Sequence, residues 1–348
     1  MSTETGRSAA ALIDFAASAL RAVGVGDEHA RTTADSLVDA DARGTHSHGL
    51  MRLPFYIAAI EEGGINPTPR LRWVSERAAA GVLEADGALG QVAMATAVDG
   101  VAARAEEFGV GAVCVQGSTH YGAGAYWTDR LASRGLLSFL TSTTGPVVAP
   151  YGGSEKVLGT DPLTLSAPGA DGHPLTADLA TSSGAYGKIL AARNEGRPIP
   201  ADWAVDAQGR PTTDPSEALA GSLTAFGGHK GSAVAVLLEA FAASLSHGAY
   251  SHEIRSIWNS PRSRMNTAHT VIALDAEAFT GRRHTEEKVA RLRDTIRGAG
   301  AAPVLAPGDP EQDRKESAAS GVVLPGSTVE ALQLLAERLD VPWPAGSR

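Results

Sequence analysis

Hydrophobic residues recur at helical spacing near both ends of the chain. Apolar side chains that return every three or four positions form one face of an amphipathic helix. Glycines that follow such stretches, at positions 24, 44 and 63, favour helix ends. Pro54 should kink the third of these helices or lie close to its start, because proline disrupts a helix interior. The helices predicted in this way span residues 8–23, 27–42, about 50–62, 284–297, 309–319 and 327–338.

The middle of the chain has a different pattern, in which short apolar runs alternate with loops and further helices. Short runs bounded by glycine, proline or polar residues are typical of strands. The predicted strands are 71–74, 81–85, 110–115, 136–142, 163–167 and 270–274, and the predicted helices are 90–108, 124–133 and 231–247. We therefore predict an α/β fold. Residues 1–75 and 300–348 should form a helical domain around a central domain of residues 76–299.

Composition narrows the possible function classes. A length of 348 residues with 43% hydrophobic and 20% charged residues suggests about two globular domains. The net charge of −9 argues against a nucleic-acid or anionic-membrane partner, since both require a basic surface. No apolar run approaches the ~18 residues of a membrane span, and Asp14 interrupts the only apolar stretch that could serve as a signal peptide. Cys114 is the single cysteine and is interpreted as a core residue. Because one cysteine cannot form a disulfide within the chain, the cytoplasm is the expected location.

Two histidines, a serine and an arginine are concentrated in residues 41–52, between the second and third predicted helices. If a helix begins near Ser47, His48 and Arg52 lie on one face of its first turns, because they are four residues apart. An imidazole can transfer a proton near neutral pH. A guanidinium can bind a carboxylate through two parallel hydrogen bonds. Together they suit a small acid whose neighbouring carbon gains or loses a proton.

Three segments rich in glycine or small polar residues lie at the boundaries of predicted elements. Residues 117–124 leave a strand, enter a helix and include His120. Residues 178–188 carry hydroxyl groups that could reach a phosphate or a ribose. Residues 226–232 open a helix, where backbone amides and a lysine could meet a phosphate. Their number, each at an element boundary, favours a binding function.

Simpler interpretations of these residues stay open. His48 or His120 could be a surface or core histidine, and Arg52 could be a surface charge. His46 and His48 could bind a metal, although the sequence marks no third ligand. The Gly-x-Gly-x-x-Gly pattern of a Rossmann dinucleotide site is absent, and residues 227–231 lack the P-loop spacing, so a nucleotide hydrolase is not predicted.

A series of ordered motifs along nearly the whole chain resembles the NAD(P)-dependent malate/L-sulfolactate/ureidoglycolate-type dehydrogenase family. That family also includes diketogulonate reductases and piperideine and pyrroline carboxylate reductases. The motifs are Ala-Asp-Ala-Arg-Gly-Thr-His-Ser-His-Gly-Leu-Met-Arg at 40–52 with Tyr56, Gly-Gly-Ile-Asn-Pro at 63–67, Gly-Ser-Thr-His-Tyr-Gly at 117–122, Ala-Pro-Tyr-Gly-Gly at 149–153, Gly-Thr-Asp-Pro at 159–162, Asp-Leu-Ala-Thr-Ser at 178–182 with Gly-Lys-Ile at 187–189, Phe-Gly-Gly-His-Lys-Gly-Ser at 226–232 and Pro-Gly-Asp-Pro at 307–310.

The resemblance implies a non-Rossmann cofactor domain with a largely antiparallel sheet, a homodimer, and hydride transfer between NAD(P)H and C2 of a 2-oxo or 2-imino acid. At the matching positions it makes His48 the candidate proton donor and Arg52 the residue that holds the substrate carboxylate. Asp178 would orient His48 or share its proton, and Ser47 belongs to the same catalytic set. His120 is the alternative acid/base, so the resemblance leaves the choice between the two histidines open.

The resemblance also assigns several segments to the cofactor. Tyr121, Asp161 and Tyr186 depart from residues common in the family, which leaves the substrate and the preference for NAD or NADP open. The residues implied to bind NAD(P)H are Thr144, Asp178, Leu179, Ala180, Thr181, Ser182, Lys188, Gly228, His229, Lys230, Gly308, Asp309 and Pro310.

The leading hypothesis is a dehydrogenase or reductase for a small 2-oxo or 2-hydroxy acid. The alternative is a cyclic-imine reductase of the piperideine or pyrroline carboxylate type, since the same hydride chemistry can act on a C=N bond. A metal-dependent hydrolase that uses His46 and His48, and a cofactor-binding protein without catalysis, are the remaining hypotheses. The expected partners are a small carboxylate substrate and a second copy of the chain.

Overall fold

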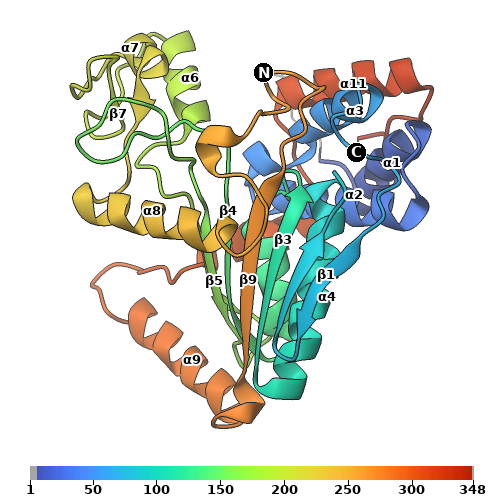
Figure 1. Ribbon diagram of the computed structural model, residues 1–348, viewed down its shortest axis with the longest axis vertical. Coiled ribbons are helices and arrows are strands. Elements are labelled where there is room, and N and C mark those ends of the chain that lie inside the picture. Colours follow the sequence, from blue (N-terminus) through green and yellow to red (C-terminus); the bar gives the residue numbers. More distant parts are fainter. Residues whose placement is uncertain (1–5, 347–348) are drawn as a thin grey trace.

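The computed structural model describes residues 6–346, which form an α/β fold around a seven-stranded sheet (Figure 1). The strands lie in the order β1-β2-β3-β9-β4-β5-β6. β2 and β3 pair in parallel, and each other neighbouring pair in this sheet is antiparallel. The prediction of a largely antiparallel sheet is therefore confirmed. The strands are β1 (Arg72–Arg77), β2 (Ala80–Glu84), β3 (Val110–Ser118), β4 (Leu136–Ser142), β5 (Leu163–Ala167), β6 (Leu175–Leu179) and β9 (Thr267–Asp275).

Strand β9 lies between β3 and β4, although it comes much later in the chain. It pairs with Val115 of β3 and with Ser142 of β4 through the same residue, His269. Helix α5 (Gly124–Ser133) connects β3 to β4. Both strands are antiparallel to β9 and thus parallel to each other, as the predicted β-α-β pattern requires. The sequence pattern did not show that a distant strand fills the space between them.

Helices from both ends of the chain gather beside one end of the sheet (Figure 1). They are α1 (Ala9–Ala22), α2 (Asp27–Ala42), α3 (Leu53–Glu61) and α11 (Gly326–Leu339). Helix α4 (Gly90–Phe108) packs against β3 and β9. One hydrophobic core joins the terminal helices to the sheet, and it includes Leu12, Leu37, Leu332, Leu83 and Val113. The domain boundaries at 75/76 and 299/300 stay a prediction.

A second, smaller core lies in a lobe at the upper left of Figure 1. The lobe contains α6 (Tyr186–Asn194), α7 (Pro215–Ala220), the paired strands β7 (Ala204–Val205) and β8 (Ser222–Leu223), and the start of α8 (His229–Ala243). Its core includes Ile189 and Leu223. The prediction omitted both β6, which is only five residues long and follows a stretch rich in proline and glycine, and these short elements. Helices α9 (Arg282–Arg297) and α10 (Asp309–Ser317) complete the fold.

The helix expected from Ser47 onward is replaced by two short 3₁₀ turns, η1 (His46–His48) and η2 (Leu50–Arg52). Gly49 separates them in an extended conformation. It lies directly against Asp41, since a Cβ on Gly49 would approach the Asp41 carboxylate carbon to 2.3 Å. Pro54 lies in the first turn of α3, which confirms the prediction that this helix begins close to the proline. Among residues 6–346 no helix is both long enough and apolar enough to cross a membrane.

Candidate active site

The structure brings the two histidines of the sequence motifs face to face. His48 comes from η1, and His120 comes from the loop that follows β3. Their ring centroids are 5.4 Å apart and their planes differ by 25°. The two candidate acid/base groups therefore belong to one site, although 72 positions of the sequence separate them.

Arg52 lies beside this pair with its guanidinium open to a ligand. Its Nε donates a hydrogen bond to the Ser47 carbonyl oxygen at 2.6 Å, and its guanidinium carbon lies 4.5 Å from the ring centre of Trp258. No acidic side chain among residues 6–346 forms an ion pair with it. Burial lowers the pKa of Arg52, and the nearby Tyr56 opposes that shift. A partly buried cation of this kind favours an incoming carboxylate.

Asp178 approaches the histidines from the end of β6. Its Oδ1 accepts a hydrogen bond from the Thr164 hydroxyl at 2.8 Å, and its Oδ2 accepts one from the Ala125 amide at 3.0 Å. The amide belongs to the first turn of α5, where backbone N–H groups favour a negative charge. Ser47 Oγ lies 2.9 Å from Nδ1 of His48. Ser47 and His48 of η1 and Asp178 of β6 are thus brought together from two separate parts of the chain.

The electrostatics of the two histidines differ. Burial lowers the pKa of His48, the Asp178 charge raises it, and the Arg52 charge lowers it further. Burial also lowers the pKa of His120, here well below its usual value, and His48, Arg52 and His269 add to the shift. A carboxylate therefore supports protonation of His48, whereas the three groups named around His120 all oppose its protonation.

Three residues that were not predicted as site residues complete this cluster. The Tyr56 hydroxyl lies 2.6 Å from Nδ1 of His120, and Gln91 Nε2 donates to that hydroxyl at 3.1 Å. The Trp258 ring packs edge-on against His120 with centroids 5.4 Å apart. Tyr56 follows Arg52 by four residues, which is a signal that sequence reasoning could have used. Gln91 and Trp258 carry no comparable signal, because only the tertiary fold brings them here.

Hydrogen bonds join three of the segments expected to bind the cofactor. Thr144 Oγ1 accepts from the Thr160 amide at 2.8 Å. Thr181 donates to the Thr160 carbonyl through both its amide, at 2.8 Å, and its hydroxyl, at 2.9 Å. The Phe226 amide in turn donates to the Thr181 carbonyl at 2.9 Å. Thr144, residues 178–182 and the start of 226–232 are therefore held side by side by hydrogen bonds through Thr160 and Thr181.

The loop at residues 226–232 turns sharply before α8. Gly228 has a φ of +64° and precedes His229, the first residue of α8. A Cβ on Gly231 would lie 1.6 Å from the Phe226 carbonyl oxygen, so only glycine fits there. Gly228, His229 and Lys230 are all exposed. The exposed helix start offers amides and a lysine to a phosphate.

The last predicted cofactor segment lies farther along β6. A Cβ on Gly308 would be 3.1 Å from the Thr176 carbonyl oxygen, so this segment packs against the strand that carries Asp178. The Asp309 carboxylate already accepts hydrogen bonds from Arg297, at 2.7 Å, and from the Ala306 amide, at 2.8 Å. Asp309 thus shapes the loop in this structure. Lys188 lies in the first turn of α6, exposed on the smaller lobe.

His46 has a structural explanation. Its Nδ1 is 2.8 Å from Asp41 Oδ1, and the other carboxylate oxygen accepts a hydrogen bond from the Leu50 amide at 2.7 Å. Asp41 therefore links the two 3₁₀ turns. Within the described range, no group of three or more His, Cys, Asp or Glu side chains is arranged to hold a metal ion.

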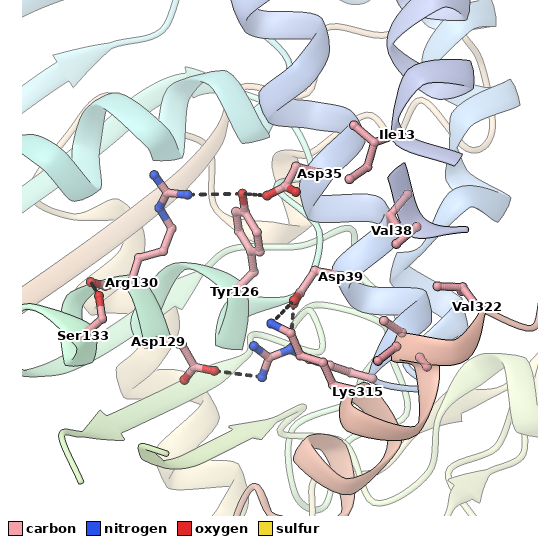
Figure 2. A pocket seen from close by; sticks show the side chains of 15 residues that line it. Ile13, Asp35, Val38, Asp39, Tyr126, Asp129, Arg130, Ser133, Lys315 and Val322 are labelled. Carbon is pink, nitrogen blue, oxygen red and sulfur yellow. Dashed lines mark hydrogen bonds and ion pairs between the residues drawn. The ribbon is translucent and has the colours of Figure 1, made fainter. Parts of the chain in front are cut away.

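A pocket of about 470 Å³ lies elsewhere, between α2, α5 and α10 (Figure 2). Its charges pair with one another: Asp39 binds Lys315 at 2.5 Å and Arg43 at 2.6 Å, and Asp129 binds Arg43 at 2.8 Å. None of the candidate catalytic residues lines it. The candidate catalytic residues therefore gather at the histidine cluster and not in this pocket.

Comparison with known proteins identifies the family of this chain. The model of the malate/L-lactate dehydrogenase family matches residues 8–333. L-sulfolactate dehydrogenase of Methanocaldococcus jannaschii is 36% identical over 299 residues, which are 85% of this chain and 86% of that protein. The ureidoglycolate dehydrogenase (NAD(+)) of Escherichia coli O157:H7 is 33% identical over 304 residues, which are 86% of each protein.

Solved structures show the same fold. Sulfolactate dehydrogenase from M. jannaschii superposes with a TM-score of 0.91 at 32% identity, covering 97% of this chain and 98% of that one. Delta1-piperideine-2-carboxylate reductase from Pseudomonas syringae pvar. tomato gives a TM-score of 0.87 at 30% identity, covering 96% and 100%. The chain therefore belongs to the malate/L-lactate dehydrogenase family.

Proposed function

We propose that this protein is an NAD(P)-dependent oxidoreductase that transfers hydride to or from C2 of a small 2-oxo or 2-hydroxy acid. The observation that carries the proposal is the meeting of His48 and His120 beside Arg52, a cation without an acidic partner in residues 6–346. The relatives named as sulfolactate and ureidoglycolate dehydrogenases support the same class of reaction.

Arg52 binds the substrate carboxylate in this mechanism. Its guanidinium is held by the Ser47 carbonyl and by the face of Trp258, so it is oriented before the substrate arrives. An oriented guanidinium can form two parallel hydrogen bonds with a carboxylate. This contact places C2 of the substrate next to the two histidines, which lowers the entropic cost of reaching the reactive geometry.

His48 moves the proton. In the direction of reduction, hydride adds to C2 and the oxygen on that carbon takes a proton from protonated His48. In the direction of oxidation, neutral His48 accepts the proton back. Asp178 favours the protonated form because its charge raises the pKa of His48 against the effect of burial. The Ser47 hydroxyl, 2.9 Å from Nδ1, orients the ring.

The residues that surround β6 fit NAD(P), which supplies or accepts the hydride when it is bound. The Thr144 hydroxyl and the exposed start of α8 suit ribose and phosphate groups, and buried Thr181 holds the Thr160 backbone beneath them. Among the relatives, one name specifies NAD(+) and another NADP(+), so both forms belong in the assay. The residues proposed to bind the cofactor are Thr144, Asp178, Leu179, Ala180, Thr181, Ser182, Lys188, Gly228, His229, Lys230, Gly308, Asp309 and Pro310.

Reduction of a cyclic imine is the second candidate function. It is favoured by the likeness to delta1-piperideine-2-carboxylate reductase over 96% of this chain. The same residues would act on it, because in a cyclic imino acid C2 likewise carries the carboxylate and is double-bonded to the atom that receives the proton. The two candidates differ only in whether oxygen or nitrogen receives the proton.

Steady-state assays test both candidates. Oxidation of NADH and of NADPH is followed spectrophotometrically against a panel of 2-oxo acids and cyclic imino acids. Turnover of a 2-oxo acid supports the first candidate, and turnover of an imine alone supports the second. Absence of oxidation with every substrate and both cofactors would overturn the proposed function.

We also infer that the protein works as a homodimer. Helix α8 and the residues just after it expose an apolar stripe of Val234, Leu237, Phe241 and Leu245, with 38%, 60%, 50% and 62% of their surfaces exposed. Helix α9 extends away from the sheet on the same side of the molecule (Figure 1). A second copy of the chain would cover this surface. Analytical ultracentrifugation should show a dimer for the wild type and a monomer for Leu237→Arg; a wild-type monomer would contradict the inference.

We also propose a domain arrangement and a cellular location for the protein. The helical unit built from both termini would supply His48 and Arg52, and the central unit would supply Asp178 and the cofactor surface. The cytoplasmic location expected from the single cysteine stays a prediction.

A further inference from the structure

Tyr56, Gln91 and His120 form a chain of hydrogen bonds behind the reacting face of the site. The Tyr56 hydroxyl oxygen is 2.6 Å from His120 Nδ1, and Gln91 Nε2 is 3.1 Å from the same oxygen. Tyr56 and Gln91 are completely buried. The direction of these hydrogen bonds is therefore decided by the side chains themselves.

The polarity follows from the number of protons available. The amide nitrogen of Gln91 can only donate, so the Tyr56 oxygen accepts from it. A hydroxyl carries one proton, and it is directed at His120 Nδ1 at 2.6 Å, because the other possible acceptor, the His120 carbonyl oxygen, is 3.5 Å away. Burial raises the pKa of Tyr56 to about 12, so the phenol keeps that proton. Nδ1 of His120 is accordingly the acceptor, and a neutral imidazole whose Nδ1 accepts carries its proton on Nε2.

The surroundings of His120 disfavour the doubly protonated ring. Burial is the largest cause that lowers its pKa, and the neighbouring His48 and Arg52 lower it further. The ring is therefore neutral when the enzyme is at neutral pH. The doubly protonated imidazolium, in which both ring nitrogens donate and Tyr56 would have to accept from Nδ1, is therefore not the form present at neutral pH.

Nε2 of His120 is free to meet a ligand. It forms no hydrogen bond with any side chain or backbone group that the structure describes. It is also absent from the set of fully buried polar atoms without a partner, so it is accessible from the site. The His48 ring is stacked at 5.4 Å, and the edge of Trp258 packs at the same distance on another side. An N–H at this position adjoins the place where Arg52 would hold the substrate.

We propose that Tyr56 and Gln91 are positioning residues that hold His120 as the neutral Nε2–H tautomer, so that His120 donates a hydrogen bond to the substrate atom attached to C2. This inference rests on the proposed function, and it divides the work of the two histidines. His48, which Asp178 helps to protonate, transfers the proton. His120 polarises the reacting double bond and stabilises the charge that develops on its oxygen or nitrogen.

The tautomer can be measured without substrate or cofactor. Proton–nitrogen-15 NMR that detects the two-bond couplings of histidine rings distinguishes the Nε2–H tautomer from the Nδ1–H tautomer. The signals of His120 are identified by their loss in His120→Asn. In the wild type we expect the Nε2–H tautomer. In Tyr56→Phe we expect a mixture of tautomers, because the donor to Nδ1 is lost. A wild-type Nδ1–H ring would overturn the proposal, since Tyr56 would then accept from His120 and donate to a rotated Gln91 amide.

Kinetics provide the second measurement. Tyr56→Phe should lower kcat by about 10- to 100-fold with a smaller change in KM. The variant loses the fixed orientation of the His120 donor, which acts in the transition state, but keeps Arg52, which binds the substrate carboxylate. Tyr126→Phe is the matched control: its hydroxyl donates to Asp35 at 2.6 Å in the pocket of Figure 2, and kcat should not change. An unchanged tautomer and an unchanged kcat in folded Tyr56→Phe would overturn the proposal.

The two hypotheses fail in different ways. If the wild type oxidises no cofactor with any substrate, the proposed function is wrong, whatever the NMR spectra show. If the wild type is active but Tyr56→Phe keeps both its tautomer and its kcat, only the positioning role is wrong. Circular dichroism of each variant confirms that the comparison is made on folded protein.

Discussion

The histidine cluster and the pocket of Figure 2 are both lined by charged and aromatic side chains, yet they differ in how those groups are satisfied. In the pocket, Asp39, Arg43, Asp129 and Lys315 form closed ion pairs. In the cluster, Arg52 has no acidic partner among residues 6–346. Groups that pair with each other stabilise the fold, whereas a partly buried group without a partner is available to a ligand.

Replacement of His48 should have the largest effect on activity. His48→Ala removes the group that transfers the proton, so kcat should fall by about a thousand-fold, within the usual range for a general acid. Cofactor binding, followed by nicotinamide fluorescence, should persist. His120→Ala should cost less than His48→Ala. His284→Ala on exposed α9 is the control, and near-normal turnover by His48→Ala would refute the assignment.

Replacement of Arg52 should affect both binding and turnover. Arg52→Gln removes the cation that holds the carboxylate, so KM should rise and kcat should fall, with about a hundred-fold loss in kcat/KM. Arg130→Gln, a change in the pocket of Figure 2, should leave both constants unchanged. Equal effects of the two replacements would break the distinction between the two regions.

Replacement of Arg43 should show the opposite behaviour. Arg43 is buried and bridges Asp39 at 2.6 Å and Asp129 at 2.8 Å. Arg43→Met leaves two buried carboxylates without this cation, so the free energy of unfolding should fall by about 3 kcal/mol. Urea denaturation measures the loss. The kcat of the folded variant, assayed well below its melting temperature, should be retained; a loss of kcat without loss of stability would contradict this prediction.

The buried acid Asp161 should produce a smaller, pH-dependent effect. Its Oδ1 lies 3.1 Å from Ser251 Oγ, and the one proton of that hydroxyl can be donated to Glu239 at 2.7 Å. Burial, followed by the contact with Glu239, raises the pKa of Asp161 well above 3.8. The folded state therefore holds a proton that the unfolded state releases, and stability is lost as pH rises through the folded pKa.

Asp161→Asn removes this dependence, because an amide has no proton to lose. The variant should be about 1 kcal/mol more stable than the wild type at pH 8, with a smaller difference at pH 5. Thermal unfolding at the two pH values measures the effect. Asp206→Asn is the control of opposite sign: hydrogen bonds from the Arg210 backbone and side chain lower the pKa of Asp206, so that variant should lose stability at pH 8.

Local patterns in the sequence were enough for much of the fold. The predicted helices 90–108 and 124–133 and the predicted strands 136–142 and 163–167 coincide with elements of the structure. These segments have clear apolar periodicity and end at glycine or polar residues. The prediction omitted β6 and the elements of the smaller lobe, which are short. It failed for the helix from Ser47, where contact of Gly49 with Asp41 overrides the local pattern.

The sequence by itself determined which side chains are available for chemistry: His48 and Arg52 on one short segment, His120 after a strand, and glycine where the backbone must turn. The tertiary structure alone decided which of them meet. It inserts β9 between β3 and β4, sets Asp178 at the start of α5, and places Tyr56 and Gln91 behind His120. These contacts join distant parts of the chain, so no local spacing encodes them, and they arise only when the core that joins the helices to the sheet is packed.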